Sequence, residues 1–177
     1  MGAAIERAPN ILPDLTFTRI FYAPRELVFQ AWTDARHVAA WWGPHGFSNP
    51  VCEVDPRPGG GFVVHMQGPD GTIYPGSGIF LEVVAPERLI FTSTFEGRDG
   101  RVLINAVNSV TFEDLDGRTR LTLNARVVDA AREAAGNLAG MEEGWTQSLE
   151  RLAAIVRAVN GAARPAARLS ISYPAGR

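Results

Sequence analysis

The stretch PRELVFQAWTDARHVAAWWGPHGFSNPVCEVDPRPGGGFVVHMQGPDGTIYP (residues 24–75) decides the fold, together with GMEEGWTQSLERL (residues 140–152). The first stretch holds a short helical segment, a Trp-Trp-Gly-Pro turn, a glycine-rich turn and strands. The second opens a long helix with an apolar stripe. Together they predict a curved sheet closed around one long helix, with aromatic side chains at the mouth of an apolar space.

The remaining sequence supplies most of the predicted sheet. Short segments rich in β-branched and aromatic residues alternate with turns made of Gly, Pro and Asp. In the last segment Leu121 and Leu123 alternate with Arg120 and Thr122, so one face is buried and the other solvated. Short connections favour an antiparallel meander of about six or seven strands. The predicted strands are residues 15–22, 51–55, 62–67, 73–84, 89–95, 102–112 and 119–127.

Three helices are predicted around this sheet. Pro24 suits the first turn of one short helix, and Asp34 caps a second one that ends at Gly43. Asn137 is the predicted N-cap of the long C-terminal helix, which Gly161 ends. A helix laid on an antiparallel sheet is an α+β arrangement. The stripe of the long helix consists of Leu138, Met141, Trp145, Leu149, Leu152, Val156 and Val159.

The composition limits the classes of partner. A chain of 177 residues with 46% hydrophobic residues fits one domain with a sizeable core. The net charge of −2 gives no reason to expect nucleic acid or an anionic membrane as partner. No apolar run reaches the length of a membrane span, and no secretory signal opens the sequence. With Cys52 as the one cysteine, an intrachain disulfide is excluded, and a cytoplasmic protein is expected.

Several spaced motifs over roughly residues 15–160 carry a family resemblance. They are Trp41-Trp42-Gly43-Pro44 with Gly46-Phe47, Pro58-Gly59-Gly60, Gly68-Pro69-Asp70-Gly71, Tyr74-Pro75-Gly76-Ser77-Gly78, Pro86-Glu87-Arg88-Leu89 and Gly140-Met141-Glu142-Glu143-Gly144-Trp145 with Leu149. In their order along the chain they resemble the heat-shock-protein ATPase activator homologues (AHSA-like proteins) of the SRPBCC superfamily. That superfamily also holds START lipid-transfer domains, polyketide cyclases and birch-allergen-like proteins. The resemblance implies a helix-grip fold, in which a curved antiparallel sheet wraps a long C-terminal helix.

The chain is thus expected to divide into a leader (1–13), an AHSA-like helix-grip domain (14–160) and a tail (161–177). The activators that gave the family its name carry a further N-terminal domain. This sequence has only the short leader, so a chaperone role is expected less than binding in the cavity. The tail segment 169–173 alternates Leu, Ile and Tyr with serines. It is either a strand added to a sheet edge or a frayed end, and the family resemblance adds the expectation of a homodimer.

Three functions follow from the predicted cavity and the resemblance. The leading one is binding of a small hydrophobic or aromatic molecule between sheet and C-terminal helix, as carrier, sensor or scavenger. The alternatives are a cavity enzyme of the cyclase or hydrolase type, and an interaction module acting on a chaperone. The glycine-rich residues 56–61 lack a phosphate-loop ending, and Ser93 and Ser109 lie in no nucleophile elbow. No catalytic residue, metal or cofactor is therefore predicted.

The candidate ligand-binding residues come from the aromatic motifs and the inward faces. Trp145 either stacks on a ligand or simply packs in the core. Of Trp41 and Trp42, one is expected inside and one near the rim. Asn108 and Ser109 face opposite ways, so one of them is expected at the cavity, where a ligand, a water or a neighbouring side chain satisfies it. The predicted lining is Trp32, Trp41, Trp42, Phe47, Met66, Tyr74, Ile79, Phe91, Phe95, Asn108, Met141, Trp145 and Leu149.

Overall fold

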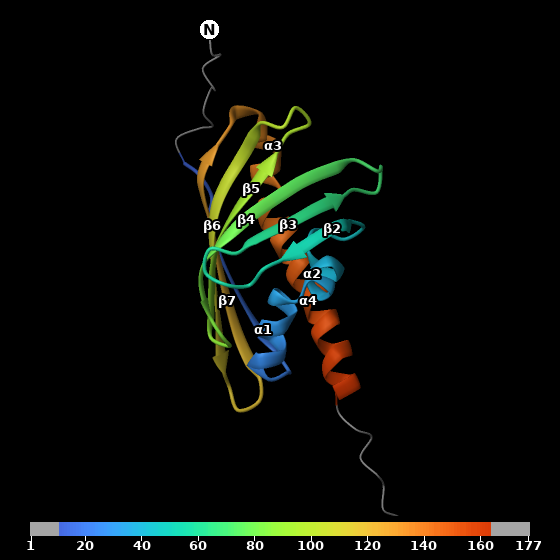
Figure 1. Ribbon diagram of the computed structural model, residues 1–177, viewed down its shortest axis with the longest axis vertical. Coiled ribbons are helices and arrows are strands. Elements are labelled where there is room, and N and C mark those ends of the chain that lie inside the picture. The colour runs from blue at the N-terminus through green and yellow to red at the C-terminus, as the bar shows by residue number, and fades with distance from the viewer. Residues whose placement is uncertain (1–10, 164–177) are drawn as a thin grey trace, which may run out of the picture.

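A curved antiparallel sheet of seven strands grips one long helix in the computed structural model, which describes residues 11–163 (Figure 1). The strands are β1 (Asp14–Phe21), β2 (Ser48–Val54), β3 (Gly61–Gln67), β4 (Ile73–Val84), β5 (Arg88–Glu96), β6 (Val102–Asp114) and β7 (Thr119–Ala130). The helices are α1 (Arg25–Thr33), α2 (Ala35–Trp41), the 3-10 turn η1 (Arg132–Ala134), α3 (Ala135–Ala139) and α4 (Met141–Ala163). The predicted α+β helix-grip class is confirmed.

The sheet is a meander closed at one edge by the first strand. Its order is β1-β7-β6-β5-β4-β3-β2, with every neighbouring pair antiparallel. Tight turns join the consecutive strands. Between β6 and β7, for example, Asp116 and Gly117 both have positive φ angles, of 53° and 82°, which is the twist that a two-residue hairpin favours. The chain crosses from β1 at one edge to β2 at the other through α1 and α2.

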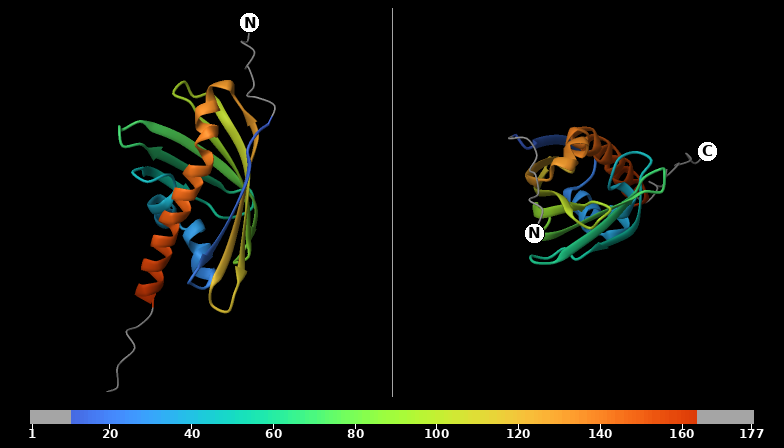
Figure 2. Two further views of the ribbon diagram at one scale, coloured as in Figure 1. Left: turned by 180° about the vertical axis from the view of Figure 1, so that it is seen from behind. Right: turned by 90° about the horizontal axis from the view of Figure 1, so that it is seen from above.

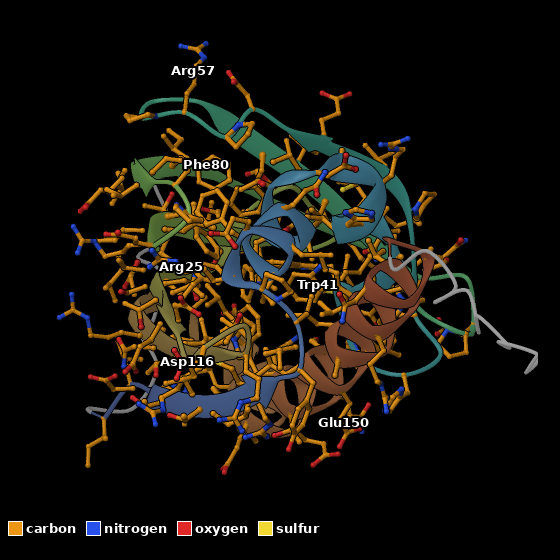
Figure 3. The ribbon with its side chains drawn as sticks, turned by 90° about the horizontal axis from the view of Figure 1, so that it is seen from below. Arg25, Trp41, Arg57, Phe80, Asp116 and Glu150 are labelled. Carbon is orange, nitrogen blue, oxygen red and sulfur yellow. The ribbon has the colours of Figure 1, made fainter. Side chains whose placement is uncertain are left out.

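The two short helices fill one end of the space inside the sheet. The Asp34 carboxylate accepts hydrogen bonds from the backbone N–H groups of Arg36 and His37, which confirms it as the cap of α2. Helix α2 ends at Trp41, two residues before the predicted stop at Gly43, because Trp42 is already extended. Figure 3 views the molecule from below, and Trp41 lies there among the side chains between the short helices and α4.

Helix α4 runs along the open side of the sheet, as both views of Figure 2 show. It buries Leu149, Leu152 and Val156 against the sheet and the short helices. Both predicted boundaries of this helix were wrong. Asn137 lies inside the separate helix α3, and Gly161 lies inside α4. A glycine costs a helix only about 1 kcal/mol, so the helix continues through it.

The glycines of β4 serve close packing. The sequence predicts a bend or bulge at Gly76 and Gly78, but the register shift between β4 and β5 falls between Phe80 and Glu82. A Cβ atom on Gly78 would collide with the carbonyl oxygen of Thr92 and with the ring of Phe62. Glycine at this position therefore lets the Phe62 ring lie directly on the sheet.

The buried side chains form two separate clusters. The larger lies where α1 and α2 pack between sheet and α4, and it includes Trp32, Trp41 and Phe112. The smaller lies at the other end of β6 and β7, around Ile104 and Val127. The short helices do not extend to the end of the sheet that holds the smaller cluster. The candidate site lies between the two clusters.

Candidate functional site

A cavity of about 490 Å³ separates the N-terminal part of α4 from the concave face of the sheet. The helix contributes Met141 and Trp145 to its wall, and the turn after α2 contributes Trp42 and Phe47. The strands β3 to β6 supply the opposite wall. Its aromatic, thioether and amide side chains include Met66, Tyr74, Phe95 and Asn108.

Two tryptophans, Trp42 and Trp145, line the inner end of the cavity, and Trp32 packs behind them. The Trp145 ring stacks on that of Trp32, with centroids 6.4 Å apart and planes inclined by 19°. It also meets Trp42 edge to face, with centroids 5.4 Å apart. Trp145 thus packs on the core through Trp32 and lines the cavity at the same time. The two roles considered for this residue are compatible.

Aromatic and sulfur-containing side chains cover the side next to α2. Phe47 packs on Tyr74 with ring centroids 5.8 Å apart, which joins the turn after α2 to β4. Gly43 has a φ of +92°, and a Cβ atom there would lie 2.9 Å from the Met66 sulfur. Glycine therefore permits both the turn and its close approach to Met66. Toward the β3–β4 and β5–β6 turns the lining includes the exposed residues Ile73 and Arg98, so this end faces solvent.

Two buried polar side chains interrupt the apolar wall on the sheet side. Ser93 of β5 is 4% exposed and Asn108 of β6 is 0% exposed, and both line the cavity. The Asn108 Nδ2 atom donates a hydrogen bond of 2.8 Å to the Ser93 hydroxyl. The other amide atom, Oδ1, is buried without a hydrogen-bond partner among the described residues. This pair is a buried polar feature of the sheet wall.

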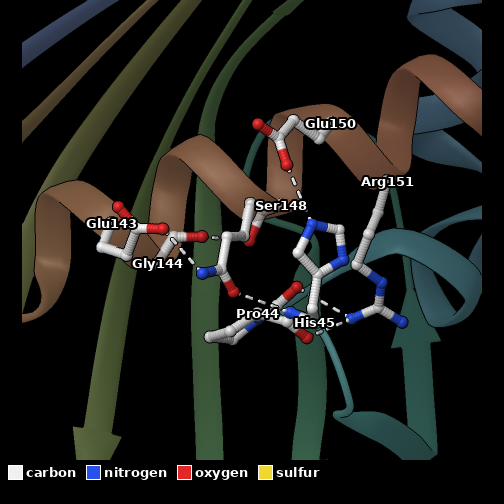
Figure 4. Close-up of polar contacts among 9 residues, drawn as sticks. Pro44, His45, Glu143, Gly144, Ser148, Glu150 and Arg151 are labelled. Atoms are coloured by element: carbon white, nitrogen blue, oxygen red, sulfur yellow. Dashed lines mark hydrogen bonds and ion pairs between the residues drawn. The ribbon is translucent and has the colours of Figure 1, made fainter.

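Arg151 holds the turn after α2 against α4 (Figure 4). Its Nη1 atom donates to the carbonyl oxygens of Trp42, Gly43 and Pro44 at 3.2, 2.8 and 2.9 Å. Its Nη2 atom donates to two further carbonyls of the same segment, those of Ala40 and Phe47, each at 3.0 Å. Burial lowers the pKa of this guanidinium from its usual value. One cation thereby bonds the Ala40 carbonyl near the end of α2 and four carbonyls of the segment that follows it.

A second set of contacts joins the same turn to the outside of α4. The His45 imidazole lies 2.8 Å from the Glu150 carboxylate. The His45 backbone N–H donates to Gln147, and Gln147 donates in turn to Glu143 (Figure 4). His45, Glu143 and Glu150 are exposed, and Gln147 is partly buried between them. With Arg151, they fix the position of Trp42 and Phe47 relative to the helix.

Comparison with known proteins identifies the family. The family model described as activator of Hsp90 ATPase homolog 1-like protein matches residues 22–157. The chain belongs to this family. Among curated proteins, none matches.

Solved structures of bacterial proteins share the fold. A protein from Nitrosomonas europaea is 28% identical, with a TM-score of 0.69 over 84% of this chain and 96% of that one. The AHSA1 protein of Silicibacter pomeroyi is 29% identical, with a TM-score of 0.71 over 83% and 99%. A protein from Arthrobacter aurescens is 27% identical, with a TM-score of 0.73 over 90% and 92%.

Three of the six motifs that carry the family resemblance converge on the cavity. Residues of the Trp-Trp-Gly-Pro turn, of the β4 motif and of the Gly-Met-Glu-Glu-Gly-Trp segment all line it, although they lie far apart in the sequence. Trp42, Tyr74 and Trp145 represent the three segments. Eight of the residues proposed from sequence line the cavity: Trp42, Phe47, Met66, Tyr74, Phe95, Asn108, Met141 and Trp145.

The other five proposed residues lie outside this cavity. Trp32 and Phe91 border a void of about 10 Å³ under the tryptophans. Trp41 and Leu149 are fully packed in the core, and the Trp41 indole donates to the Ala31 carbonyl at 2.8 Å. The placement of Ile79 in the cavity was wrong. It is 50% exposed because Phe80, its neighbour in an alternating strand, takes the inward position.

Both Trp41 and Trp42 are buried, so the expectation that one of them lies at the rim was also wrong. Ser93 is one of the polar lining residues that the prediction missed. It alternates with Phe91 and Phe95 on one strand, and this period of two would have placed it on the same face.

The structure also bears on metal binding and membranes. Within residues 11–163, no cluster of three or more His, Cys, Asp or Glu side chains is placed to hold a metal ion. No helix in that range combines the length and apolar character needed to span a bilayer.

The Cys52 thiol is half-buried, and this burial, with a smaller effect from the Asp34 charge, raises its pKa to about 11.

Proposed function

We propose that the protein binds a small apolar or aromatic molecule in the cavity between α4 and the sheet, as a carrier, sensor or scavenger. The observation that supports this most is the cavity itself. A volume of about 490 Å³ within a packed domain falls in the range of roughly 300–1,000 Å³ seen for small-molecule sites. Packed interiors rarely leave such a space, and an apolar ligand would regain the contacts that its walls lack.

The chemistry of the wall supports an apolar ligand. Indole and phenyl rings present large flat surfaces at the inner end, where Trp42 and Trp145 meet edge to face. The thioether groups of Met66 and Met141 are polarizable and adapt to ligands of different shape. A flat aromatic molecule fits such walls with little loss of hydrogen bonding to water.

The frame around the cavity supports a preformed site. The five carbonyl contacts of Arg151 and the stacking of Trp145 on Trp32 fix two walls before a ligand arrives. Preformed walls reduce the ordering that binding requires, which favours affinity.

The test is a fluorescence titration with a panel of neutral aromatic and aliphatic compounds. Because Trp42 and Trp145 line the cavity, a bound ligand should quench or shift the tryptophan emission. Trp145→Phe should remove much of the signal and keep an aromatic wall. A panel that gives neither a spectral change nor a thermal shift would refute the proposal.

A further inference from the structure

The polar pair on the sheet wall is incomplete in its hydrogen bonding. The Asn108 Oδ1 atom is buried and accepts no hydrogen bond within residues 11–163. The Ser93 oxygen accepts from Asn108 Nδ2 at 2.8 Å, which leaves the hydroxyl hydrogen of Ser93 free to donate. One acceptor and one donor thus lack partners within residues 11–163, on two adjacent side chains whose residues line the cavity.

Buried amides normally satisfy both of their polar atoms, and each exception needs an explanation. A leucine of similar size would fill this position in the strand without the cost of burying an unpaired oxygen. The neighbouring inward residues of β6, Ile104, Ala106 and Val110, are indeed apolar. Asn108 therefore stands out from its own strand face, and the cavity it lines is where a partner would lie.

We propose that the ligand is a neutral molecule with an apolar or aromatic body and a hydroxyl group, and that this hydroxyl binds between Asn108 and Ser93. The hydroxyl donates to Asn108 Oδ1 and accepts from the Ser93 hydroxyl. This inference rests on the proposed function, since it specifies the ligand of the same cavity.

The match to a hydroxyl does not depend on how the amide is turned. With the amide reversed, Ser93 donates to Oδ1 and the amide NH₂ is left as the free group. A hydroxyl can accept from that NH₂ as well as donate to an oxygen. A group that only donates satisfies the free amide atom in the first orientation alone, and a group that only accepts satisfies it in the second alone.

The distribution of charged residues on the lining favours a neutral ligand group beside Asn108. The ionic side chains on the lining, Glu96 and Arg98, belong to the end of β5 and the turn after it. Glu96 is three residues from Ser93, which is roughly 10 Å along an extended strand. A carboxylate beside Asn108 would therefore lose its water without gaining a cation, which is unfavourable.

Three probes of one shape test this: 2-naphthol, 2-methylnaphthalene and 2-naphthoate, titrated by calorimetry at pH 7 against the full chain. A phenolic hydroxyl, with a pKa of about 10, remains neutral there. We expect 2-naphthol to bind about fivefold to tenfold more tightly than 2-methylnaphthalene, and 2-naphthoate to bind least. Asn108→Leu should abolish the preference for 2-naphthol and leave the affinity for 2-methylnaphthalene equal or higher.

Two further variants control the comparison. The first is Asn105→Leu. Asn105 lies on the same strand and accepts a hydrogen bond from Thr94, but it is absent from the cavity lining. This variant should keep the wild-type preference. Ser93→Ala removes the donor to the ligand together with the acceptor of the Asn108 Nδ2 hydrogen bond. It should reduce the preference in part, and it serves if Asn108→Leu does not fold.

The outcomes separate this inference from the proposed function. If all three probes bind with equal affinity, if 2-naphthoate binds most tightly, or if the preference survives in both Asn108→Leu and Ser93→Ala, the hydroxyl site is wrong and the apolar cavity stands. If none of the probes binds, the proposed function fails and the hydroxyl site fails with it.

Discussion

The Arg151 guanidinium donates a 2.8 Å hydrogen bond to the Gly43 carbonyl. This bond joins α4 to the turn that contributes Trp42 and Phe47 to the cavity lining. Four other carbonyls of residues 40–47 share the same guanidinium. A planar group with five N–H donors suits this arrangement, and a lysine ammonium cannot reproduce it.

Arg151→Lys should therefore lower the free energy of unfolding by about 2 kcal/mol, because several partly buried carbonyls lose their donors. Chemical denaturation measures this loss. The matched control is Arg157→Lys, since Arg157 is exposed on the same helix and should tolerate the change within about 0.5 kcal/mol. Equal effects at the two positions would contradict the role given to Arg151.

Asp34 predicts a pH dependence of stability. The hydrogen bond from the Arg36 side chain, with backbone N–H donors of α2, lowers the pKa of this carboxyl to about 2 from 3.8. A depressed pKa in the folded state stabilises the protein above the unfolded value, and this stabilisation is lost as pH falls through the folded value. The loss should therefore fall between about pH 4 and pH 2.

The measurement is the difference in unfolding free energy between the wild type and Asp34→Asn. Asparagine can still cap α2 but carries no charge. The advantage of the wild type should be constant above pH 5 and shrink toward pH 2. At pH 7, Asp34→Ala should cost about 1 kcal/mol. A difference that does not change with pH would refute the titration assigned to Asp34.

Cys52 should react slowly in the folded protein. Its thiol has a pKa of about 11 against an ordinary 9.0, because it is half-buried and because the Asp34 charge opposes the thiolate. Two pKa units reduce the thiolate fraction near pH 8 by roughly 100-fold. Iodoacetamide should thus label the folded chain far more slowly than the chain in denaturant. Similar labelling rates in both states would disprove this.

The pattern of the sequence was sufficient for the architecture. Alternation and turn residues predicted the strands to within a few residues, because a sheet with one buried face needs that period. The ends of α4 could not be predicted, since packing against the sheet overrides the local preference of Gly161 and Asn137.

The site was predicted in part for a similar reason. Aromatic motifs indicated which segments form the cavity, whereas the division between cavity and core depends on how far α1 and α2 fill the sheet. Trp41 and Trp42 are adjacent in sequence, yet only Trp42 lines the large cavity. The pairing of Ser93 with Asn108 depends on the register of β5 against β6, which composition does not specify.

The homodimer and the role of the tail remain predictions. The segment 169–173 lies outside the described residues, so its expected strand is tested only by experiment. Light scattering on the full chain and on a chain ending at Asn160 separates the possibilities. That end point keeps the hydrogen bond of 3.0 Å from Asn160 to the Tyr22 carbonyl. If both chains run as monomers, the dimer is refuted. If both run as dimers, the tail is not the cause of the dimer.

A side chain that fills the cavity should remove ligand binding. Ala106 is 3% exposed and lines the cavity, so Ala106→Phe should occupy its space, while Ala158→Phe places the same ring on the exposed surface of α4. The measurement is calorimetric titration of both folded variants and the wild type with 2-naphthol. The account predicts binding to the wild type and Ala158→Phe, and at least a tenfold loss in Ala106→Phe. Equal affinity in all three proteins, or no binding to the wild type, would contradict it.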